Sequence, residues 1–385
     1  MSSSPASDRP GVPSLGASPV VPTYGPDCLG AVLPGVAAAL GAPIALPAVP
    51  LPTAERVCVV LVDGLGHHLL HQNATDAPFL ASMAGTVLRA GTPSTTATSV
   101  ASFGTGRPPG QHGLVGYQVM DPDRGELLNE LRWDPAVDPA RWQPHPTVFE
   151  HLTAAGIGCT AIGNPEFDGS GLTQAALRGP QFVGVGGLHQ RVDVAVRALA
   201  APGLVYLYWG QIDAAGHQHG VTSRNWLRAL READEALARL ARQLPSGTLL
   251  LITADHGMID VPHEFRVDLA TRPDLQPGIR VLAGEARFAQ AYCEPGAAAE
   301  VARRLSDAFG ELAWVRTRDE AIADHWFGPV DDRVVGRIGD VVVAGREPFV
   351  FVDSRTTAPH ELKLIGQHGS LTDAEQLVPL LEYIA

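Results

Sequence analysis

The sequence predicts an α/β fold: a mostly parallel central sheet with helices on both faces, and an inserted α+β cap. Three separate runs of apolar, largely β-branched residues predict strands, because continuous apolar runs are typical of strands buried on both faces. Helical segments lie between these runs, and strands that alternate with helices are typical of an open parallel sheet. A stretch of different pattern, 259–365, predicts the cap.

The first ordered elements are expected after an N-terminal arm. Residues 1–25 are rich in Ser, Pro and Gly and lack apolar periodicity, which predicts a disordered or extended arm. A short helix is expected over 29–41. The run RVCVVLVDGLG (56–66) predicts the first buried strand, which would deliver Asp63 at its carboxyl end.

The middle of the chain predicts further elements of the same kind. AGIGCTAIGN (155–164) is expected to be a strand bordered by turn glycines, and 192–201 is expected to be a helix. Over 223–244 apolar side chains recur at helical spacing, which predicts a long amphipathic helix.

Two more apolar runs have the same pattern as the first predicted strand. GLVYLYWGQID (203–213) would deliver Asp213, and GTLLLITADHG (247–257) would deliver Asp255 and His256. Parallel strands end at one edge of their sheet, where ligands of α/β proteins bind. These side chains are therefore expected to meet Asp63 at the same rim.

The late part of the chain predicts the cap and a final helix. Between 259 and 365, strand-like pieces flank one helix-like stretch, with many Pro and Gly between them. We expect an inserted α+β cap that roofs the site or shapes access to it. The metal-binding core would then comprise 26–258 and 366–385. The tail 371–384 predicts a final amphipathic helix capped by Thr372.

Composition and charge restrict the kind of partner. The 385 residues carry a net charge of −13 and no basic stripe, which argues against generic nucleic-acid binding because counter-ion release needs clustered Lys and Arg. Bound metal cations can still let an acidic enzyme act on anions. The four cysteines are scattered. Neither a secretory signal nor a run of about 18 apolar residues is recognisable, so we expect a cytoplasmic protein without a membrane partner.

The Asp and His side chains at the strand ends predict a metal site. One Asp after a strand is ordinary as a turn or cap residue. Three of them, with His256 beside one and His217 four residues after Asp213, are hard to explain wholly in that way. The spacing of Asp213 and His217 suits one side of a helical turn. Oxygen and nitrogen ligands without Cys suit Zn²⁺, and Mn²⁺ or Co²⁺ less selectively.

The segment TPSTTATSVASFGTGRPPGQHG (92–113) holds the candidate nucleophile. Taken singly, each of its hydroxyl side chains is explained as a helix cap. A helix start also binds a phosphoryl oxygen through free backbone N–H groups and the helix dipole. A hydroxyl beside a dication can act as an alkoxide. These arguments leave open which of the clustered hydroxyls would react.

Five ordered segments resemble the alkaline phosphatase superfamily, specifically its type I phosphodiesterase/nucleotide pyrophosphatase branch. P-S-T-T-A-T-S-V (93–100), followed by T-G and then H-G, resembles the nucleophile segment P-S-x-T-F-P-N-H of that branch. Its metal-binding segments are resembled by V-D-G-L-G, Q-I-D-A-A-G-H-Q-H-G, T-A-D-H-G-M and G-Q-H-G, in family order from about 63 to 369.

The resemblance implies the roles of individual residues. Thr96 would be the nucleophile and form a covalent phosphothreonine. One metal ion would be held by Asp213, His217 and His368. The other would be held by Asp63, Asp255, His256 and the oxygen of Thr96. Two such cations, Zn²⁺ in the first place and Mn²⁺ as a substitute, would clamp the attacking and leaving oxygens.

The residues after Thr96 depart from the family pattern. Ala97-Thr98-Ser99 stands where the family has Phe-Pro-Asn, so Ser99 would replace the Asn as hydrogen-bond donor to a phosphate oxygen. We find no counterpart of the Arg with which alkaline phosphatases grip a phosphomonoester, or of their third, magnesium site. The sequence therefore predicts a two-metal hydrolase of small-molecule phosphodiesters or nucleotide pyrophosphates. The alternative is a phosphomonoesterase or phosphonate hydrolase of the same superfamily.

Overall fold

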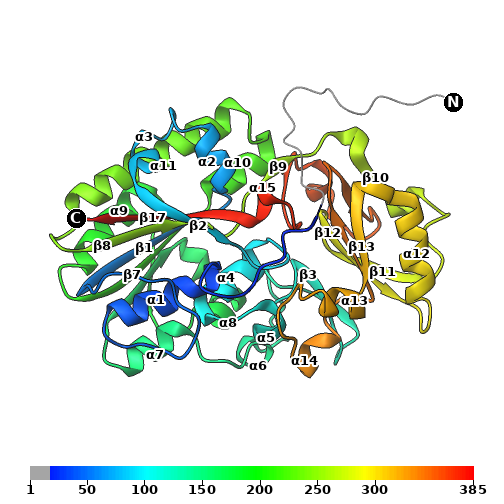
Figure 1. Cartoon of the computed structure of the whole chain (residues 1–385), viewed down its shortest axis with the longest axis horizontal. Coiled ribbons are helices and arrows are strands. Elements are labelled where there is room, and N and C mark those ends of the chain that lie inside the picture. The colour runs from blue at the N-terminus through cyan, green and yellow to red at the C-terminus, as the bar shows by residue number, and fades with distance from the viewer. Residues whose placement is uncertain (1–17) are drawn as a thin grey trace.

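A central sheet of seven strands forms the larger part of the molecule. The computed structural model describes residues 18–385 (Figure 1). Five strands run parallel, in the order β8 (Leu249–Thr253), β1 (Arg56–Val62), β7 (Gly203–Trp209), β5 (Cys159–Gly163) and β6 (Gln181–Gly184). Beyond β8 lie β17 (Leu377–Ile384) and β2 (Ala84–Arg89), with β17 antiparallel to both of its neighbours. The predicted mostly parallel α/β sheet is confirmed.

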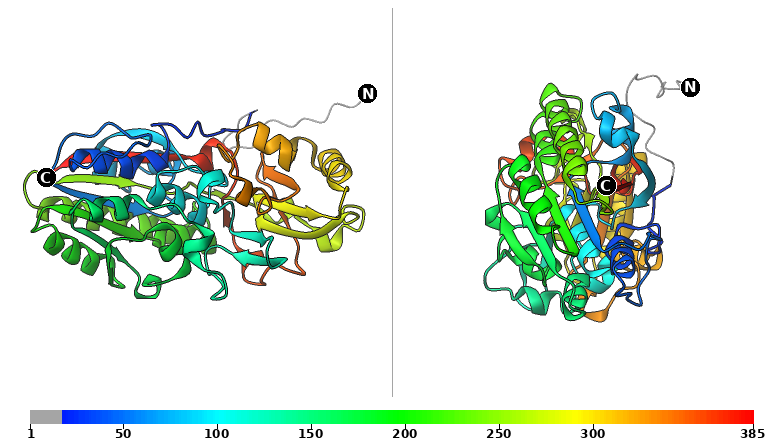
Figure 2. Two further views of the ribbon diagram at one scale, coloured as in Figure 1. Left: turned by 90° about the horizontal axis from the view of Figure 1, so that it is seen from below. Right: turned by 90° about the vertical axis from the view of Figure 1, so that its left-hand side faces the viewer.

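Helices cover both faces of this sheet (Figure 2). One face carries α3 (Pro78–Ser82), α9 (Leu188–Ala198) and α11 (Arg224–Gln243), and the other carries α1 (Val32–Ala39), α4 (Thr96–Thr105), α7 (Val148–Ala154) and α8 (Gly171–Ala176). Strand β7 contacts both layers, because side chains alternate between the faces of a strand. Its Tyr206 contacts Phe103 of α4, whereas Trp209 lies beneath the guanidinium of Arg191 on α9.

A second, antiparallel sheet with its own apolar core forms the smaller part of the molecule (Figure 1). Its strand order is β11 (Ile279–Glu285), β12 (Phe288–Cys293), β14 (Val341–Gly345) and β13 (Ala313–Thr317), and α12 (Ala298–Phe309) packs on it. Two short ladders lie between the sheets, β9 (Ile259–Asp260) with β16 (Gly366–Gln367) and β10 (Arg266–Asp268) with β15 (Val350–Val352). These elements have the α+β character predicted for 259–365, while the domain limits themselves stay a prediction.

Shorter elements connect these parts. The hairpin of β3 (Gln118–Asp121) and β4 (Glu126–Asn129) contacts β11 of the smaller sheet. The remaining helices are α2 (His67–Gln72), α5 (Pro109–His112), α6 (Pro139–Trp142), α10 (Gln211–His219), α13 (Arg318–Ala323), α14 (Asp332–Val335) and α15 (Asp373–Gln376). No helix in the described part of the chain has both the length and the apolar character needed to cross a membrane.

The final helix predicted over 371–384 is wrong. Only α15 is helical there, and β17 follows it as an interior strand that pairs with β2 and β8. The run Leu-Val-Pro-Leu-Leu is apolar throughout, and periodicity alone does not distinguish such a run from a buried helix. Pro379 argues against a helix at this point, because proline removes a hydrogen bond inside a helix. It lies where β17 pairs with β2 and not yet with β8.

The predicted N-terminal arm falls mostly outside the described residues. Residues 1–17 are not described, and from Ser18 onward the chain runs along the body of the molecule. Val20 N–H donates to Leu371 O at 2.8 Å, and the Tyr24 hydroxyl donates to Trp326 O at 2.5 Å. This described part of the arm thus contacts segments far away in the sequence.

A buried ion pair joins the smaller sheet to the core. Arg287 lies in the turn between β11 and β12 and donates from Nε and Nη2 to the two carboxylate oxygens of Glu375 on α15, at 2.7 and 2.8 Å. Both side chains are fully buried. Glu375 also accepts hydrogen bonds from Ser370 N–H and the Thr372 hydroxyl. The pair therefore ties the second sheet to the segment that follows His368.

Candidate metal centre and active site

Two of the predicted aspartates lie side by side at the carboxyl ends of β1 and β8. Asp255 Oδ1 accepts hydrogen bonds from Gly64 N–H and His256 N–H, each at 3.1 Å. Asp63 Oδ2 accepts a hydrogen bond from the hydroxyl of Tyr208, the penultimate residue of β7. Burial, together with the charges of Asp255 and Asp213, raises the pKa of Asp63 well above its ordinary value. Such a group needs cations to stay ionised at this position.

Three histidines direct the same ring atom into the site. The Nδ1 atoms of His217, His256 and His368 lie 2.8, 3.0 and 2.9 Å from the carbonyl oxygens of Gly366, Gly257 and Ser94. A carbonyl only accepts, so Nδ1 carries the hydrogen and the neutral ring keeps its lone pair on Nε2. This arrangement is usual for histidines that bind a metal through Nε2.

Helix α10 brings Asp213 and His217 together, as their spacing predicted. Asp213 Oδ1 lies 3.4 Å from His217 Nε2 and 3.8 Å from His368 Nε2. Asp213, His217 and His368 each offer one ligand atom within 4.8 Å of the others, which is the first predicted set. A second group at this spacing contains Asp63, Asp213 and His256. Asp255 borders it, with Oδ2 at 3.7 Å from His256 Nε2.

The residues present fit two divalent cations. The lone pairs of His217 Nε2 and His368 Nε2 face each other at 3.2 Å, where they repel unless a cation lies beside them. Among the described residues, three buried carboxylate oxygens of the site also lack a hydrogen-bond partner: Asp63 Oδ1, Asp213 Oδ1 and Asp255 Oδ2. Buried carboxylates are normally paired or bound to a metal. This set of oxygen and imidazole ligands suits Zn²⁺ and also accepts Mn²⁺.

Thr96 is the first residue of α4 and faces this cluster. Its Oγ1 lies 3.3 Å from His256 Nε2 and 3.5 Å from Asp63 Oδ2. Thr95 is the N-cap and its side chain makes no capping bond. The backbone N–H groups of the first turn are thus available, and the helix dipole favours an anion there. Among the clustered hydroxyls, Thr96 is the one with both Asp63 and His256 beside it.

Ser99, predicted to bind a phosphate oxygen, is fully buried within α4, and its hydroxyl has no hydrogen-bond partner. It does not line the cavity, but neither do Asp63, Asp255 and His256. Ser99 follows Thr96 by three residues, which places the two on neighbouring positions of one helix face. Its role toward a phosphate oxygen stays a prediction.

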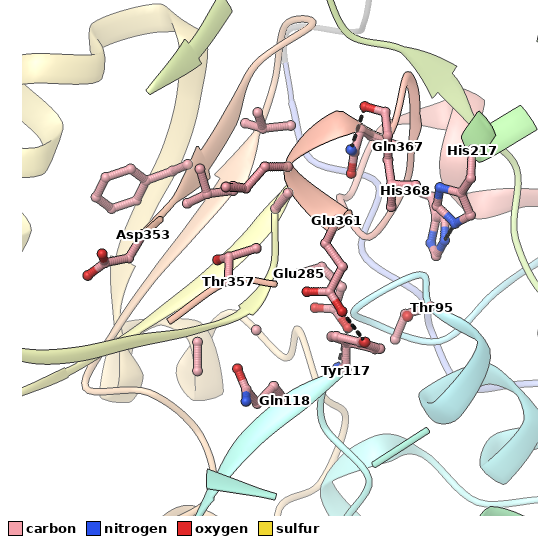
Figure 3. A pocket seen from close by; sticks show the side chains of 18 of the residues that line it. Thr95, Tyr117, Gln118, His217, Glu285, Asp353, Thr357, Glu361, Gln367 and His368 are labelled. Carbon is pink, nitrogen blue, oxygen red and sulfur yellow. Dashed lines mark hydrogen bonds between the residues drawn. The ribbon is translucent and has the colours of Figure 1, made fainter. Parts of the chain in front are cut away.

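A cavity of about 460 Å³ opens in front of Thr96 and the first ligand set (Figure 3). The core contributes Thr96, Asp213, His217 and His368 to its lining. The opposite wall comes from Leu282–Ala286 and Val350–Asp353 of the smaller part, and from the segment 357–364. The smaller sheet thus forms one side of this cavity, and its role as a cap stays a prediction.

Several residues of this site were not found from the sequence. Tyr208 orients Asp63, but one tyrosine in an apolar strand gives no pattern by which to recognise it. Glu285 and Glu361 line the cavity from segments whose contacts depend on the placement of the second sheet. Tyr117 lies beside them and donates its hydroxyl to Glu361 at 2.8 Å (Figure 3).

Known proteins resemble this chain in sequence. The family described as type I phosphodiesterase/nucleotide pyrophosphatase matches residues 57–371. A phosphopentomutase of Anaeromyxobacter dehalogenans is 34% identical over 119 residues, which make up 30% of this chain and 28% of that protein. This local match spans little more than a quarter of the relative.

Solved structures resemble the chain in fold. Murine ectonucleotide pyrophosphatase/phosphodiesterase 5 superposes with a TM-score of 0.69 and 18% identity, over 84% of this chain and 87% of that chain. An inactive variant of that enzyme in complex with AMP gives 0.69 and 17%, over 85% and 87%. Phosphonoacetate hydrolase of Sinorhizobium meliloti with phosphonoformate gives 0.66 and 21%, over 86% and 90%.

These solved structures share the alkaline phosphatase-like α/β fold, and at such identities their likeness concerns the fold alone. The family match concerns the sequence. It extends over most of the chain and includes Asp63, Thr96, Asp213 and Asp255. The chain therefore belongs to the type I phosphodiesterase/nucleotide pyrophosphatase family.

Proposed function

We propose that this enzyme hydrolyses phosphodiesters or nucleotide pyrophosphates with two divalent cations and a covalent phosphothreonine on Thr96. That the chain is a phosphoric ester hydrolase follows from its family. The observation that carries the finer proposal is the cluster of three aspartates and three histidines around the first residue of α4, beside a cavity.

Thr96 would attack phosphorus while the bond to the leaving oxygen breaks, and water would then cleave the phosphothreonine. Asp63 and His256 lie at 3.5 and 3.3 Å from Oγ1 and hold the hydroxyl at the mouth of the cavity. The first N–H groups of α4 would donate to the phosphoryl oxygens. When bound, the cations would supply the positive charge that stabilises negative charge on the attacking and leaving oxygens. Asp213, His217 and His368 would hold one of them, and Asp63, Asp255, His256 and Thr96 the other.

The charges that line the cavity favour a diester over a monoester. Of the two arginines among the described lining residues, Arg266 donates to the carbonyl oxygens of Val261, Leu362 and Leu364. Arg132 is exposed and lies 3.0 Å from His360 Nε2. Both Nη atoms of Arg266 are thus occupied, which leaves no pair of them to grip the dianionic end of a phosphomonoester in the bidentate way that arginine allows. A monoanionic diester makes a smaller demand on positive charge.

A paired assay on purified, zinc-loaded protein tests the proposal. Hydrolysis of a nitrophenyl phosphodiester is expected to exceed that of the nitrophenyl phosphomonoester and of a nitrophenyl phosphonate monoester. Acid-quenched protein is expected to carry the phosphoryl adduct on the peptide that contains Thr96. If the monoester or the phosphonate is the better substrate, the alternative activity of the superfamily replaces the proposed one.

Substitutions separate the nucleophile from its neighbours. Thr96→Ala is expected to abolish both turnover and the adduct, and Asp255→Asn to lower zinc content. Thr98→Val is the matched control: it removes a buried hydroxyl from the same helix turn with little change of shape. It should retain the activity of the wild type. Turnover of the best substrate by Thr96→Ala at the rate of the wild type would rule out the covalent mechanism.

A further inference from the structure

Glu285 is a buried carboxyl group that the proposed chemistry does not use. It is the last residue of β11 in the smaller sheet. Its side chain lies beside Glu361 and near Thr95, the residue before Thr96 (Figure 3). Its side chain is 8% exposed. Oε1 accepts a hydrogen bond from Tyr117 N–H, whereas Oε2 is buried and has no partner.

The other acidic residues of the cavity wall each have a hydrogen-bond or ion-pair partner. Asp353 forms an ion pair with Arg355 at 2.6 Å. Asp268 Oδ1 accepts from two backbone N–H groups, each at 3.0 Å. Glu361 Oε1 accepts the hydroxyl of Tyr117 at 2.8 Å. Among the described acidic residues of this wall, Glu285 is thus distinguished by an oxygen that is buried and has no partner.

A metal ion does not account for this oxygen. Glu285 belongs to neither group of candidate metal ligands among the described residues. Burial raises the pKa of Glu285 to about 8, against the opposing effects of the Tyr117 N–H and the Thr95 hydroxyl. Among the described residues, Oε2 therefore lacks a cationic or hydrogen-bond-donating partner, and a buried polar atom without one is costly.

We propose that Glu285 is a specificity-determining residue whose Oε2 binds a hydrogen-bond donor, an ammonium or a hydroxyl group, carried by the substrate close to its phosphoryl group. This inference rests on the proposed function, because it assigns the ligand chemistry of the same cavity. Thr96 and Glu285 line the same cavity, and Thr95, the residue before Thr96, lies beside Glu285. A substituent close to the phosphoryl group is therefore the one that Glu285 would contact.

The same carboxyl group disfavours a substrate that bears a carboxylate at that position. Two carboxylates in a water-poor cavity repel each other, or one of them must take up a proton. Esters of amino alcohols and of polyols fit this subsite, whereas phosphonoacetate, with its carboxylate one carbon from phosphorus, does not.

Four small ligands that differ at one group test the subsite. Binding of 2-aminoethyl phosphate, 2-hydroxyethyl phosphate, ethyl phosphate and carboxymethyl phosphate to zinc-loaded protein is measured by isothermal titration calorimetry. The ammonium ligand is expected to bind about 10- to 100-fold more tightly than ethyl phosphate, as a charge-assisted hydrogen bond allows. The hydroxyl ligand is expected to gain less, and the carboxylate ligand to bind more weakly than ethyl phosphate.

Two variants decide whether Glu285 itself is responsible. Glu285→Gln keeps an oxygen for Tyr117 N–H, so it preserves the fold while it removes the carboxyl group that an ammonium ligand would ionise and pair with. It should bring the four affinities close together. Glu361→Gln removes another acidic group of the same wall and should keep the ranking of the wild type. Equal affinities in the wild type, an unchanged ranking in Glu285→Gln, or an equal loss in Glu361→Gln would each overturn the inference.

The nitrophenyl diester assay on the same preparation separates the two proposals. If the diester is hydrolysed but the ligands bind alike, the Glu285 subsite is wrong and the proposed function stands. If the ligands rank as expected while no ester is hydrolysed, the proposed function fails and the donor subsite stands.

Discussion

Replacement of Arg287 by Ala tests how the second sheet is held against the metal centre. The guanidinium makes five hydrogen bonds, two of them to Glu375 and three to the carbonyl oxygens of Gly345, Glu347 and Phe349. In Arg287→Ala the carboxylate of Glu375 stays buried and loses its counter-ion. Removing one partner of a buried ion pair costs about 3–5 kcal/mol, because the remaining charge is uncompensated.

Urea unfolding, followed by fluorescence and by circular dichroism, measures this effect. The midpoint for Arg287→Ala should fall by the equivalent of about 3–5 kcal/mol. Activity and zinc content should fall with it, because Glu375 also holds Ser370 N–H, two residues after His368. The double variant Arg287→Ala/Glu375→Ala should lose less than the sum of the single losses, since no charge is then stranded.

Arg303→Ala provides the matched control. Arg303 also pairs with carboxylates, those of Glu300 and Asp307, but on an exposed face of α12. Exposed ion pairs contribute little to stability, so this variant should unfold like the wild type. If Arg287→Ala unfolds at the same midpoint as Arg303→Ala, the buried pair does not hold the two parts together and the reasoning fails.

Four further predictions follow from the site and its surroundings. Tyr208→Phe removes the hydrogen bond to Asp63 and should weaken zinc binding about 10-fold or more, as competition with a chelator will measure; unchanged affinity would count against an orienting role. Removing zinc with a chelator should lower the melting temperature, and added zinc should restore it. Gly257→Ala would place a Cβ atom 2.0 Å from Ala374 O, so metal analysis should find less zinc in this variant than in the wild type. Burial raises the pKa of Glu130 to about 8, so the stability present below its ordinary pKa is lost as the pH rises through 8. Melting temperatures between about pH 5 and 9 should therefore fall more steeply for the wild type than for Glu130→Gln, and parallel curves would contradict this.

Local chemistry in the sequence predicted the core of the fold and the clustering of most candidate metal ligands. The apolar runs that end at Asp63, Asp213 and Asp255 are strands β1, β7 and β8, and their carboxyl ends meet because neighbouring parallel strands end together. The spacing of Asp213 and His217 was sufficient because one helix, α10, carries both residues.

Features that depend on distant packing were not predictable in this way. β17 becomes a strand because the edges of β2 and β8 lie on either side of it. The residues 377–384 alone do not indicate that these two strands are their neighbours. The position of Glu285 beside Tyr117 depends on how β11 packs against the larger part of the molecule, which the sequence does not indicate.

The interior position of β17 has a consequence for how the chain folds during synthesis. β2 and β8 are made long before β17, and each would expose an unpaired edge beside apolar core residues until Leu377–Ile384 has emerged from the ribosome. Open strand edges promote association between chains. The nascent protein should therefore depend on chaperones until β17 closes the sheet, and a shortened chain that lacks β17 should aggregate although it retains every predicted metal ligand.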